Sequence, residues 1–311
     1  MGIAHVDEVE GHELSVGHLR ATWSFLGHAA GSVGVGLSRI RIPAGGWSTP
    51  AHDHGVEEEL FYVLGGRGLA WHKSETFEIG EGDCILFPPR RGPHTLHGLD
   101  DLDVLAFGPR VWDESARFPR LGASLVGNRY VESLDGSTEG LPTQFVREAE
   151  LGPPELAEPK PRPSTIVDVR NVEPNLIDRP RVKRLNRNVG VALGSVTTGL
   201  RHVEVSAGML SAPQHCHSLE EELFVMLEGD GTLLLGDEEI PVRTGHVVAR
   251  PPGTGVAHTF RGGENGLTYL AYGTREPGDM CFYPRSNKIS FRGLGGLIVR
   301  IDNLDYWDGE D

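Results

Sequence analysis

The sequence predicts an all-β protein built from two similar halves, and three observations support this prediction. Short apolar runs alternate with clusters of Gly, Pro and Asp, and turn signals recur about every 8 to 12 residues. Long stretches of helical period are absent, while 42 glycines and 21 prolines suit many tight turns. One pattern of histidine and glutamate occurs twice. Together these features are typical of β-sandwiches and small β-barrels.

The predicted strands follow the same order in both halves. The clearest apolar runs of the first half are 36–42, 60–64, 84–87 and 104–107. Those of the second half are 200–205, 223–227, 247–249 and 267–272.

The repeat extends well beyond these runs. With an offset of 163, Ile3 aligns with Ile166 and Gly66 with Gly229, and by Phe118 and Tyr283 the offset has grown to 165. A repeat of this length indicates a duplicated domain rather than a solenoid unit. We predict domains at 1–132 and 164–311, joined by a linker at 133–163 whose frequent prolines favour extended chain without a core of its own.

Composition limits the partners and the location. The net charge of −15 argues against nucleic acid, because phosphate binding needs a basic face. Neither a secretory signal nor an apolar run of membrane-spanning length is visible, so we expect no membrane partner. The cysteines Cys84, Cys216 and Cys281 form no Cys-x-x-Cys pair and suggest reduced thiols, which predicts a cytoplasmic protein.

The repeated polar residues predict two metal sites. Three histidines and one glutamate are the inventory of a mononuclear metal centre. The chain contains this inventory twice at matching intervals, as His52, His54, Glu59 and His94, and as His215, His217, Glu222 and His258.

Strand parity indicates how each set converges. His52 and His54 are two residues apart, so on a strand both point to the same side. Glu59 has the opposite parity, so the chain must bend and present Glu59 from the adjacent strand. Glu59, Phe61 and Val63 then face inward. His94 follows a double-proline turn and comes from a third strand.

These residues resemble the motifs of the cupin superfamily, and the duplicated chain resembles a bicupin. Gly46, His52, His54, Glu59 and Gly66 match the first cupin motif fully, and Gly208, His215, His217, Glu222 and Gly229 match it with one extra residue. The second motif matches at Gly82, Pro88 and His94 and at Gly245, Pro251, Gly253 and His258, again with extra residues. The C-terminal tail is also similar to bacterial cupin proteins without an assigned activity. The resemblance implies a double-stranded β-helix (jelly-roll) barrel in each half, with the four named side chains as metal ligands.

The ligand set leaves the metal and the reaction open. Mixed nitrogen and carboxylate ligands suit Mn, Fe, Co, Ni or Zn, and two coordination positions stay free for a small-molecule ligand. We expect an enzyme acting on a small oxygenated or carboxylate substrate, with dioxygenation favoured over decarboxylation or isomerisation. Pro50-Ala51 and Pro213-Gln214 stand where bicupin oxalate decarboxylases have an arginine, which argues against oxalate. The alternative is a non-catalytic binding or storage protein with a structural metal.

The two halves differ beside the predicted sites. Arg90 and Arg91 lie in the turn before His94, where the second half has Gly253 and Thr254. Two guanidinium groups near an open metal would suit a carboxylate, so we predict two metals but one productive pocket, with Arg90 and Arg91 as substrate-binding residues. Strand edges in cupins often pair between subunits, so the resemblance leaves a homo-oligomer open.

Overall fold

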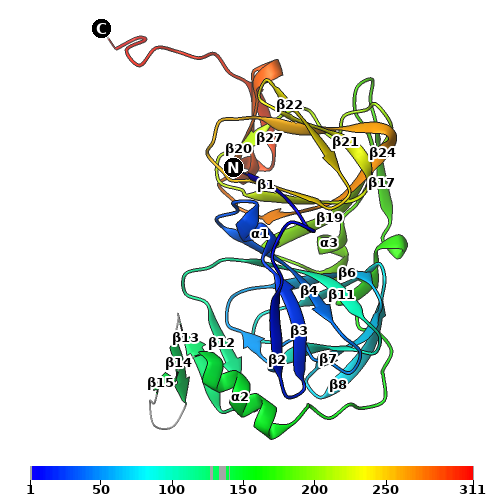
Figure 1. Cartoon of the computed structure of the whole chain (residues 1–311). Coiled ribbons are helices and arrows are strands. Elements are labelled where there is room, and N and C mark those ends of the chain that lie inside the picture. Colours follow the sequence, from blue (N-terminus) through cyan, green and yellow to red (C-terminus); the bar gives the residue numbers. More distant parts are fainter. Residues whose placement is uncertain (1, 127–128, 133–137, 140, 311) are drawn as a thin grey trace.

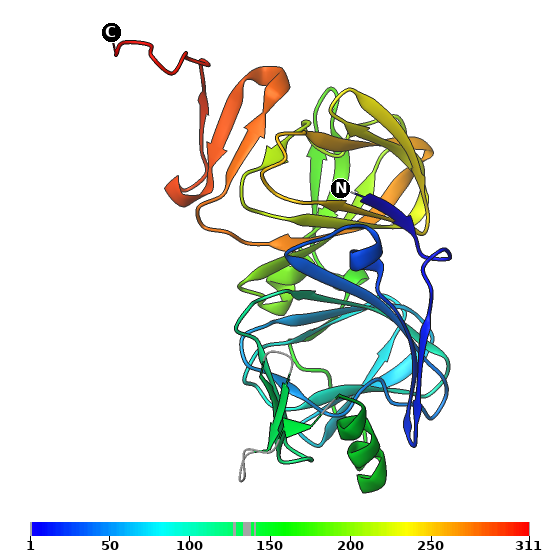
Figure 2. The same ribbon diagram turned by 60° about the vertical axis from the view of Figure 1, so that its left-hand side comes forward.

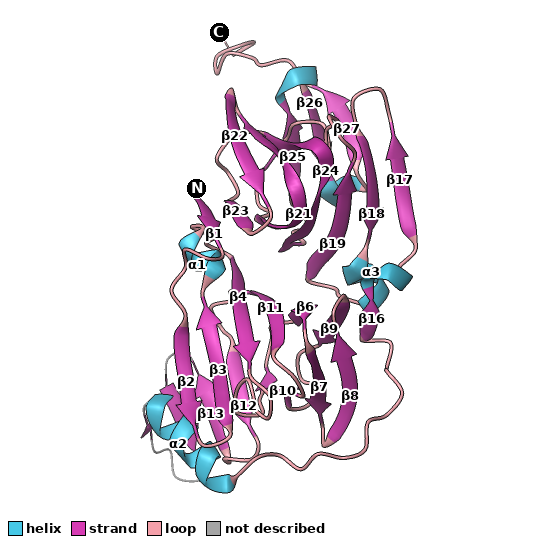
Figure 3. Ribbon diagram, turned by 45° about the vertical axis from the view of Figure 1, so that its right-hand side comes forward, coloured by secondary structure: helices cyan, strands magenta, loops and turns pink. Residues whose placement is uncertain are grey.

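The computed structural model describes residues 2–126, 129–132, 138–139 and 141–310. Figure 1 shows two β-rich halves, one above the other. The described helices are short and lie at the margins of the sheets (Figure 3): α1 (Leu26–Ala29), α2 (Leu141–Leu151) and α3 (Val189–Leu193), with single 3₁₀ turns at Val169–Asn171, Pro284–Ser286 and Arg292–Leu294. The all-β prediction and the two jelly rolls are confirmed. Among the described strands, the sheets end in edge strands and do not close into continuous hydrogen-bonded barrels.

The first half is built on one large sheet with two smaller ones. The large sheet has the order β16 (Ile166–Asp168), β9 (Asp83–Phe87), β6 (Glu59–Gly65), β11 (Leu102–Pro109), β4 (Val35–Ile42), β3 (Leu19–Ser24) and β2 (His12–Val16). The smaller sheets are β10 (His94–Gly98), β7 (Arg67–His72) and β8 (Glu75–Gly80), and β15 (Thr138–Glu139), β14 (Arg129–Glu132), β13 (Ala123–Val126), β12 (Ser115–Phe118) and β5 (Asp53–His54).

The second half repeats this plan with longer strands. Its large sheet has the order β1 (Gly2–His5), β23 (His246–Arg250), β21 (Glu222–Leu235), β24 (His258–Thr274), β19 (Thr198–Val205), β18 (Lys183–Arg187) and β17 (Pro174–Asp178), with β22 (Glu238–Arg243) paired to β21. The smaller sheet contains β20 (Cys216–His217), β25 (Met280–Tyr283), β26 (Lys288–Phe291) and β27 (Leu297–Arg300).

The two halves exchange their first strands. Strand β1 pairs antiparallel with β23 of the second half, with Ile3 opposite Val248. Strand β16 pairs in the same way with β9 of the first half, with Ile166 opposite Ile85. Figure 2 shows the N-terminal strand lying against the upper half. Each large sheet therefore contains one strand from the other half. The predicted boundaries divide the sequence into two halves, but β1 and β16 each belong to the sheet of the opposite half.

Alternating residues of β6 and β21 serve two different cores, as their parity predicts. Phe61 and Val63 pack inside the first jelly roll, and Phe224 and Met226 pack inside the second. The intervening residues form one shared core between the halves: Leu60, Tyr62, Leu223 and Val225. The second face of each sheet is therefore buried against the other half, which rules out independent motion of the two sheets without loss of apolar contact.

The predicted linker contains two of the described elements, strand β15 and helix α2. Helix α2 occupies part of it, while residues 152–163 are without regular structure, in keeping with their prolines. Residues 133–137 and 140 of the predicted linker lie outside the described residues. None of the described helices combines the length and apolar character needed to cross a membrane.

Two motif glycines are required by their backbone geometry. Gly66 and Gly229 both have φ +77°, a conformation that favours glycine. A Cβ atom at Gly66 would lie 2.1 Å from the carbonyl oxygen of Asp101, and one at Gly229 would lie 2.3 Å from that of Gly266. These glycines let neighbouring segments of the backbone approach closely.

Candidate metal sites

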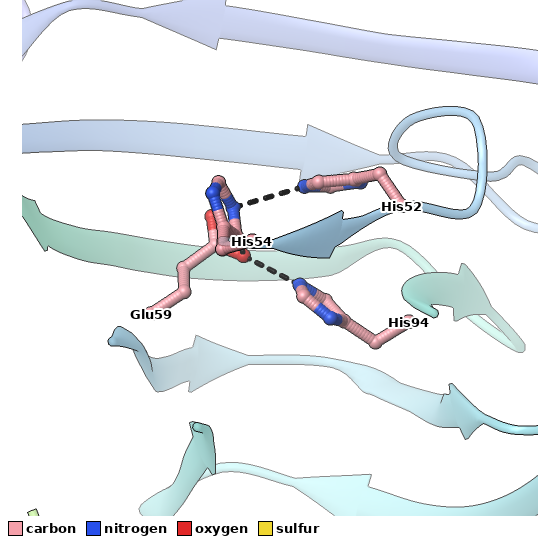
Figure 4. A group of neighbouring side chains, drawn as sticks. All are labelled: His52, His54, Glu59 and His94. Carbon is pink, nitrogen blue, oxygen red and sulfur yellow. Dashed lines mark hydrogen bonds and ion pairs between the residues drawn. The ribbon is translucent and has the colours of Figure 1, made fainter. Parts of the chain in front are cut away.

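The structure brings together the four predicted residues of the first half. His52 directly precedes the short strand β5, and His54 is the last residue of that strand. Glu59 begins β6, and His94 begins β10. Figure 4 shows their polar atoms pointing toward one region. His52 Nε2 lies 3.2 Å from His54 Nε2, and Glu59 Oε2 lies 2.8 Å from His94 Nε2. One ligand atom from each of the four residues lies within 4.8 Å of all the others.

The donor atoms fit a shared cation better than they fit one another. His52 Nδ1 donates to the carbonyl oxygen of Pro50 at 2.9 Å, so the proton sits on Nδ1 and Nε2 carries a lone pair. Atoms bound to one cation at about 2.0 to 2.2 Å are separated by roughly 3 Å, which matches the spacing of the two Nε2 atoms. The first set therefore has the chemistry and the spacing of a divalent transition-metal site.

The second set has a related geometry centred on Glu222. Its Oε2 atom lies 3.1 Å from His258 Nε2, 3.6 Å from His217 Nε2 and 4.0 Å from His215 Nε2. His215 Nδ1 donates to the carbonyl oxygen of Pro213 at 2.8 Å, as His52 does in the first half. The close groups of this half are three overlapping triads: His215, Glu222 and His258; His215, His217 and Cys281; and His217, Glu220 and Asp279.

Cys281 is a neighbour that the sequence analysis did not place at a site. It lies on β25 opposite His217 on β20. The offset of 165 aligns it with Ala116, which lies opposite His54. This alignment is the feature of the sequence from which the position of Cys281 beside the second site could have been predicted. Burial raises the pKa of the Cys281 thiol to about 12, which favours the neutral thiol.

Two further carboxylates orient the imidazoles, and the sequence analysis missed both. Glu114 Oε1 lies 3.4 Å from His54 Nδ1, and Asp279 Oδ2 lies 2.7 Å from His217 Nδ1. Backbone amides hold these carboxylates, since Glu114 accepts from Gly55 N at 2.8 Å and Asp279 from Leu219 N at 2.9 Å. The offset of 165 aligns these two acidic positions and could have identified them.

Burial and charge shift the pKa values of the site residues strongly. Burial lowers the pKa of His52 to about 3, and the neighbouring His94 and His54 add to this. Burial also opposes protonation of His54, but the hydrogen bonds to Glu114 and Glu59 outweigh it and raise its pKa to about 10. The pKa of Glu59 is lowered, because its bonds to His54 and His94 outweigh burial. These shifts favour an ionised Glu59, a neutral His52 and a protonated His54.

The cavities beside the two sites differ in size and lining. A cavity of about 420 Å³ in the second half is lined by all four predicted ligands of that half, together with Arg201, Thr259, Tyr269 and Tyr283. The cavity described beside the first site has about 280 Å³, and Glu59 is the one predicted ligand in its lining. In the first half, the ring of Phe87 also stacks on His94, with ring centroids 4.0 Å apart.

Three arginines surround the second site at positions where the first half has uncharged residues. The repeat aligns Arg184 with Ala21, Arg201 with Ser38 and Arg250 with Phe87. Arg184 and Arg201 line the larger cavity. Arg201 is exposed and lies on the wall of this cavity; desolvation lowers the pKa of its guanidinium, and attraction to Glu222 opposes that effect.

Arg90 and Arg91 lie in an exposed turn. The Arg90 Nε atom donates to the carbonyl oxygen of Gly55 at 2.8 Å, and the carbonyl oxygen of Arg91 contacts His72 Nε2 at 3.0 Å. Neither arginine lines the two cavities beside the sites. Their role in substrate binding stays a prediction.

Comparisons with known proteins agree with this architecture. A family model described as a cupin domain matches residues 38–107 and again residues 201–270. An uncharacterized protein of Methanocaldococcus jannaschii is 36% identical over 68 residues, which are 22% of this chain and 53% of that protein, so the chain spans about half the length of this curated relative.

Solved structures show the likeness over both halves. An oxalate decarboxylase variant from Bacillus subtilis is 17% identical, with a TM-score of 0.55, and the match covers 88% of this chain and 76% of that one. A putative sugar phosphate isomerase from Acidithiobacillus ferrooxidans is 27% identical with a TM-score of 0.41, covering 44% of this chain and 93% of that one. The first likeness concerns the fold, and it extends over both jelly rolls. With two matched domains and a two-domain fold, the chain belongs to the cupin superfamily as a duplicated member, a bicupin.

Proposed function

We propose that this bicupin is a metal-dependent enzyme that binds a divalent transition metal in each half and transforms a small oxygenated or carboxylate substrate in the second half. The observation that carries the proposal is the cavity of about 420 Å³, whose wall contains His215, His217, Glu222 and His258. Small-molecule sites commonly have volumes of about 300 to 1,000 Å³. A metal held there would have a space beside it for a substrate.

The ligands leave room for substrate at the metal as well. Four protein ligands on a metal that accepts six leave two positions open. A bound metal would supply Lewis acidity and a template for the ligand's oxygen atoms. The protein groups supply orientation: Asp279 fixes the His217 ring, and Tyr283 stacks on His215 with ring centroids 5.8 Å apart.

A structural metal is the better proposal for the first half. Phe87 stacks on His94 there, and the described cavity contacts Glu59 but none of the three histidines. This arrangement limits access to a metal between them. The non-catalytic alternative therefore applies to the first site, while the second site carries the proposed activity.

The proposal includes more reaction classes than the dioxygenation that the sequence analysis favoured. Dioxygenation, decarboxylation and isomerisation all suit an open metal with mixed ligands. The similar solved structures named above are a decarboxylase and an isomerase by their names, so the preference for dioxygenation gains no support from them. One oxalate decarboxylase structure is described by its Mn(II) centres, which places manganese first among the metals to be tested here.

Metal analysis combined with substrate screening tests the proposal. The full chain, purified without added metal and then loaded with Mn, Fe, Co, Ni or Zn, should retain two metals. His217→Ala should remove one metal and abolish turnover on a panel of carboxylates, sugars and phenols, with oxygen uptake recorded in parallel. His54→Ala should remove the other metal and leave turnover measurable. Absence of both oxygen uptake and product formation for every loaded form would refute the enzymatic proposal.

A further inference from the structure

Across one row of residues in each large sheet, the two halves differ at a single position. In the second half, β21, β24 and β19 align Phe224, Ala271 and Arg201 across the sheet. In the first half, β6, β11 and β4 align Phe61, Ala106 and Ser38. The aromatic and the alanine are retained, and a serine is replaced by an arginine. The difference places a positive charge in the second cavity without altering the surrounding sheet.

Small residues connect this arginine to the predicted metal ligands. Glu222 lies opposite Gly273 on β24, next to the Phe224 and Ala271 pair. Neighbouring strands are about 4.8 Å apart and residues along a strand about 3.4 Å apart, so Arg201 and Glu222, two strands and two residues apart, stand roughly 12 Å from each other at the backbone. Ala271 and Gly273 between them leave the cavity open over that distance. The arginine side chain and a small ligand can together span the gap.

Arg201 is also the cavity arginine that has no assigned protein partner. Arg275 donates to the carbonyl oxygen of Ser195, and Arg292 forms an ion pair with Glu220. Arg184 hydrogen-bonds the hydroxyl of Tyr269. Among the described residues, no hydrogen bond or ion pair is found for the Arg201 guanidinium, although it lines the cavity. A cation on the wall of a cavity, without a protein partner of its own, favours an anionic ligand.

We infer that Arg201 binds a carboxylate of the substrate while a second oxygen group of the same molecule ligates the metal. The inference rests on the proposed function and narrows its substrate to small acids that carry a carboxylate and a second oxygen donor. Guanidinium forms two parallel hydrogen bonds with carboxylate, which orients the ligand as well as attracting it. Ser38, at the matching position of the first half, offers neither the charge nor the paired hydrogen bonds.

Equilibrium binding to the Mn-loaded full chain tests this inference directly. Malonate and its neutral diamide, malonamide, are titrated by calorimetry into the wild type, Arg201→Gln and Arg201→Lys. Arg67→Gln is the control, because Arg67 is an exposed arginine paired with Asp100. Wild type and control should bind malonate more tightly than malonamide. Arg201→Gln should weaken malonate binding on the order of 10- to 100-fold and leave malonamide unchanged, since hydrogen bonds to charged groups are strong.

The variants and outcomes keep the test decisive. Metal content and thermal midpoint show whether Arg201→Gln is folded; if it is not, Arg201→Lys decides, with a smaller loss expected because the charge remains. Equal malonate affinity in Arg201→Gln and wild type would overturn the inference, as would a wild type that binds neither compound or does not distinguish them. Malonate binding that depends on Arg201 without turnover of any acid would uphold the inference and refute the enzymatic function. Turnover of an acid that does not change in Arg201→Gln would uphold the enzymatic function and refute the inference about Arg201.

Discussion

The carboxylate of Glu58 accepts a hydrogen bond from the hydroxyl of Ser195 at 2.8 Å, across the boundary between the two halves. It also accepts from the backbone amide of Val196 at 2.7 Å. The relationship is reciprocal, because Glu221 accepts from the backbone amide of Val33 at 2.9 Å. Glu58 and Glu221 each directly precede a predicted metal ligand. In each half, a residue that joins the two halves is therefore adjacent in sequence to a predicted metal ligand.

Substitution Glu58→Ala should destabilise the whole chain. It removes the buried carboxylate that accepts from the Ser195 hydroxyl and from the amides of Val196, Thr197 and Thr198. Loss of such charge-assisted bonds lowers the free energy of unfolding by about 2 to 4 kcal/mol. Urea denaturation measures the change, with the exposed Glu238→Ala as the control. A loss equal to that of the control would show that Glu58 does not hold the halves together.

The same residue predicts a pH dependence. Burial raises the pKa of Glu58, but bonds from Val196, Ser195, Thr197 and Thr198 outweigh it and lower the pKa below its ordinary 4.5. A carboxyl group with a lowered folded-state pKa contributes stability above its ordinary pKa, and that contribution is lost as pH falls through the folded-state value. The stability difference between wild type and Glu58→Gln should therefore be constant near neutral pH and shrink below about pH 4. A difference that grows on acidification would contradict this assignment.

Each orienting carboxylate should affect one metal only. Glu114→Gln should weaken the metal of the first half, and Asp279→Asn that of the second, by about 10- to 100-fold, as replaced partners of metal-binding histidines usually do. The expectation follows from their positions beside His54 Nδ1 and His217 Nδ1. Competition with a chelator gives both affinities, with Glu238→Gln as the control. Equal weakening of both metals by either change would disprove independent sites.

Metal binding at the first site should release a proton. His54 in the metal-free protein has a pKa raised to about 10 by Glu114 and Glu59 against the effect of burial, so it is protonated at neutral pH. The metal must displace this proton, and its affinity should fall by about tenfold per pH unit on acidification. Calorimetry of His217→Ala in buffers of different ionisation enthalpy counts the released protons. A binding constant that does not change with pH would exclude a protonated His54.

The metal-ligand pattern and the strand parity were readable from the sequence because both are local. His52 and His54 share a side of the chain, and the alternation of Leu60 with Phe61 assigns each to a separate core. The repeat added Glu222 and Phe224 by alignment. The pleat of a strand points successive side chains to opposite faces, so this alternation can be predicted without knowing which strands lie beside it.

The features that escaped prediction depend on contacts between distant segments. The pairing of Ile3 with Val248 and of Ile166 with Ile85 joins residues that no local pattern connects. The emphasis on Arg90 came from its closeness in sequence to His94, whereas the charge that lines a cavity, Arg201, comes from another strand. Which arginine faces a site depends on sheet order, and sheet order was not available from one sequence.

Cys281 offers a test of the ligand set itself. Its thiol lies with His215 and His217 in one of the close groups of the second site, yet burial raises its pKa to about 12. A coordinating thiol would have to lose its proton, whereas Glu222 is already a carboxylate, so we expect three histidines and Glu222 to bind the metal and Cys281 to stay neutral. Cys281→Ala reproduces the first half, where Ala116 stands at this position. The variant should retain both metals, and its Co-loaded form should have the same absorption spectrum as the Co-loaded wild type. A thiolate-to-cobalt charge-transfer band in the wild type that disappears in the variant would instead make Cys281 a ligand and replace the predicted ligand set of the second half.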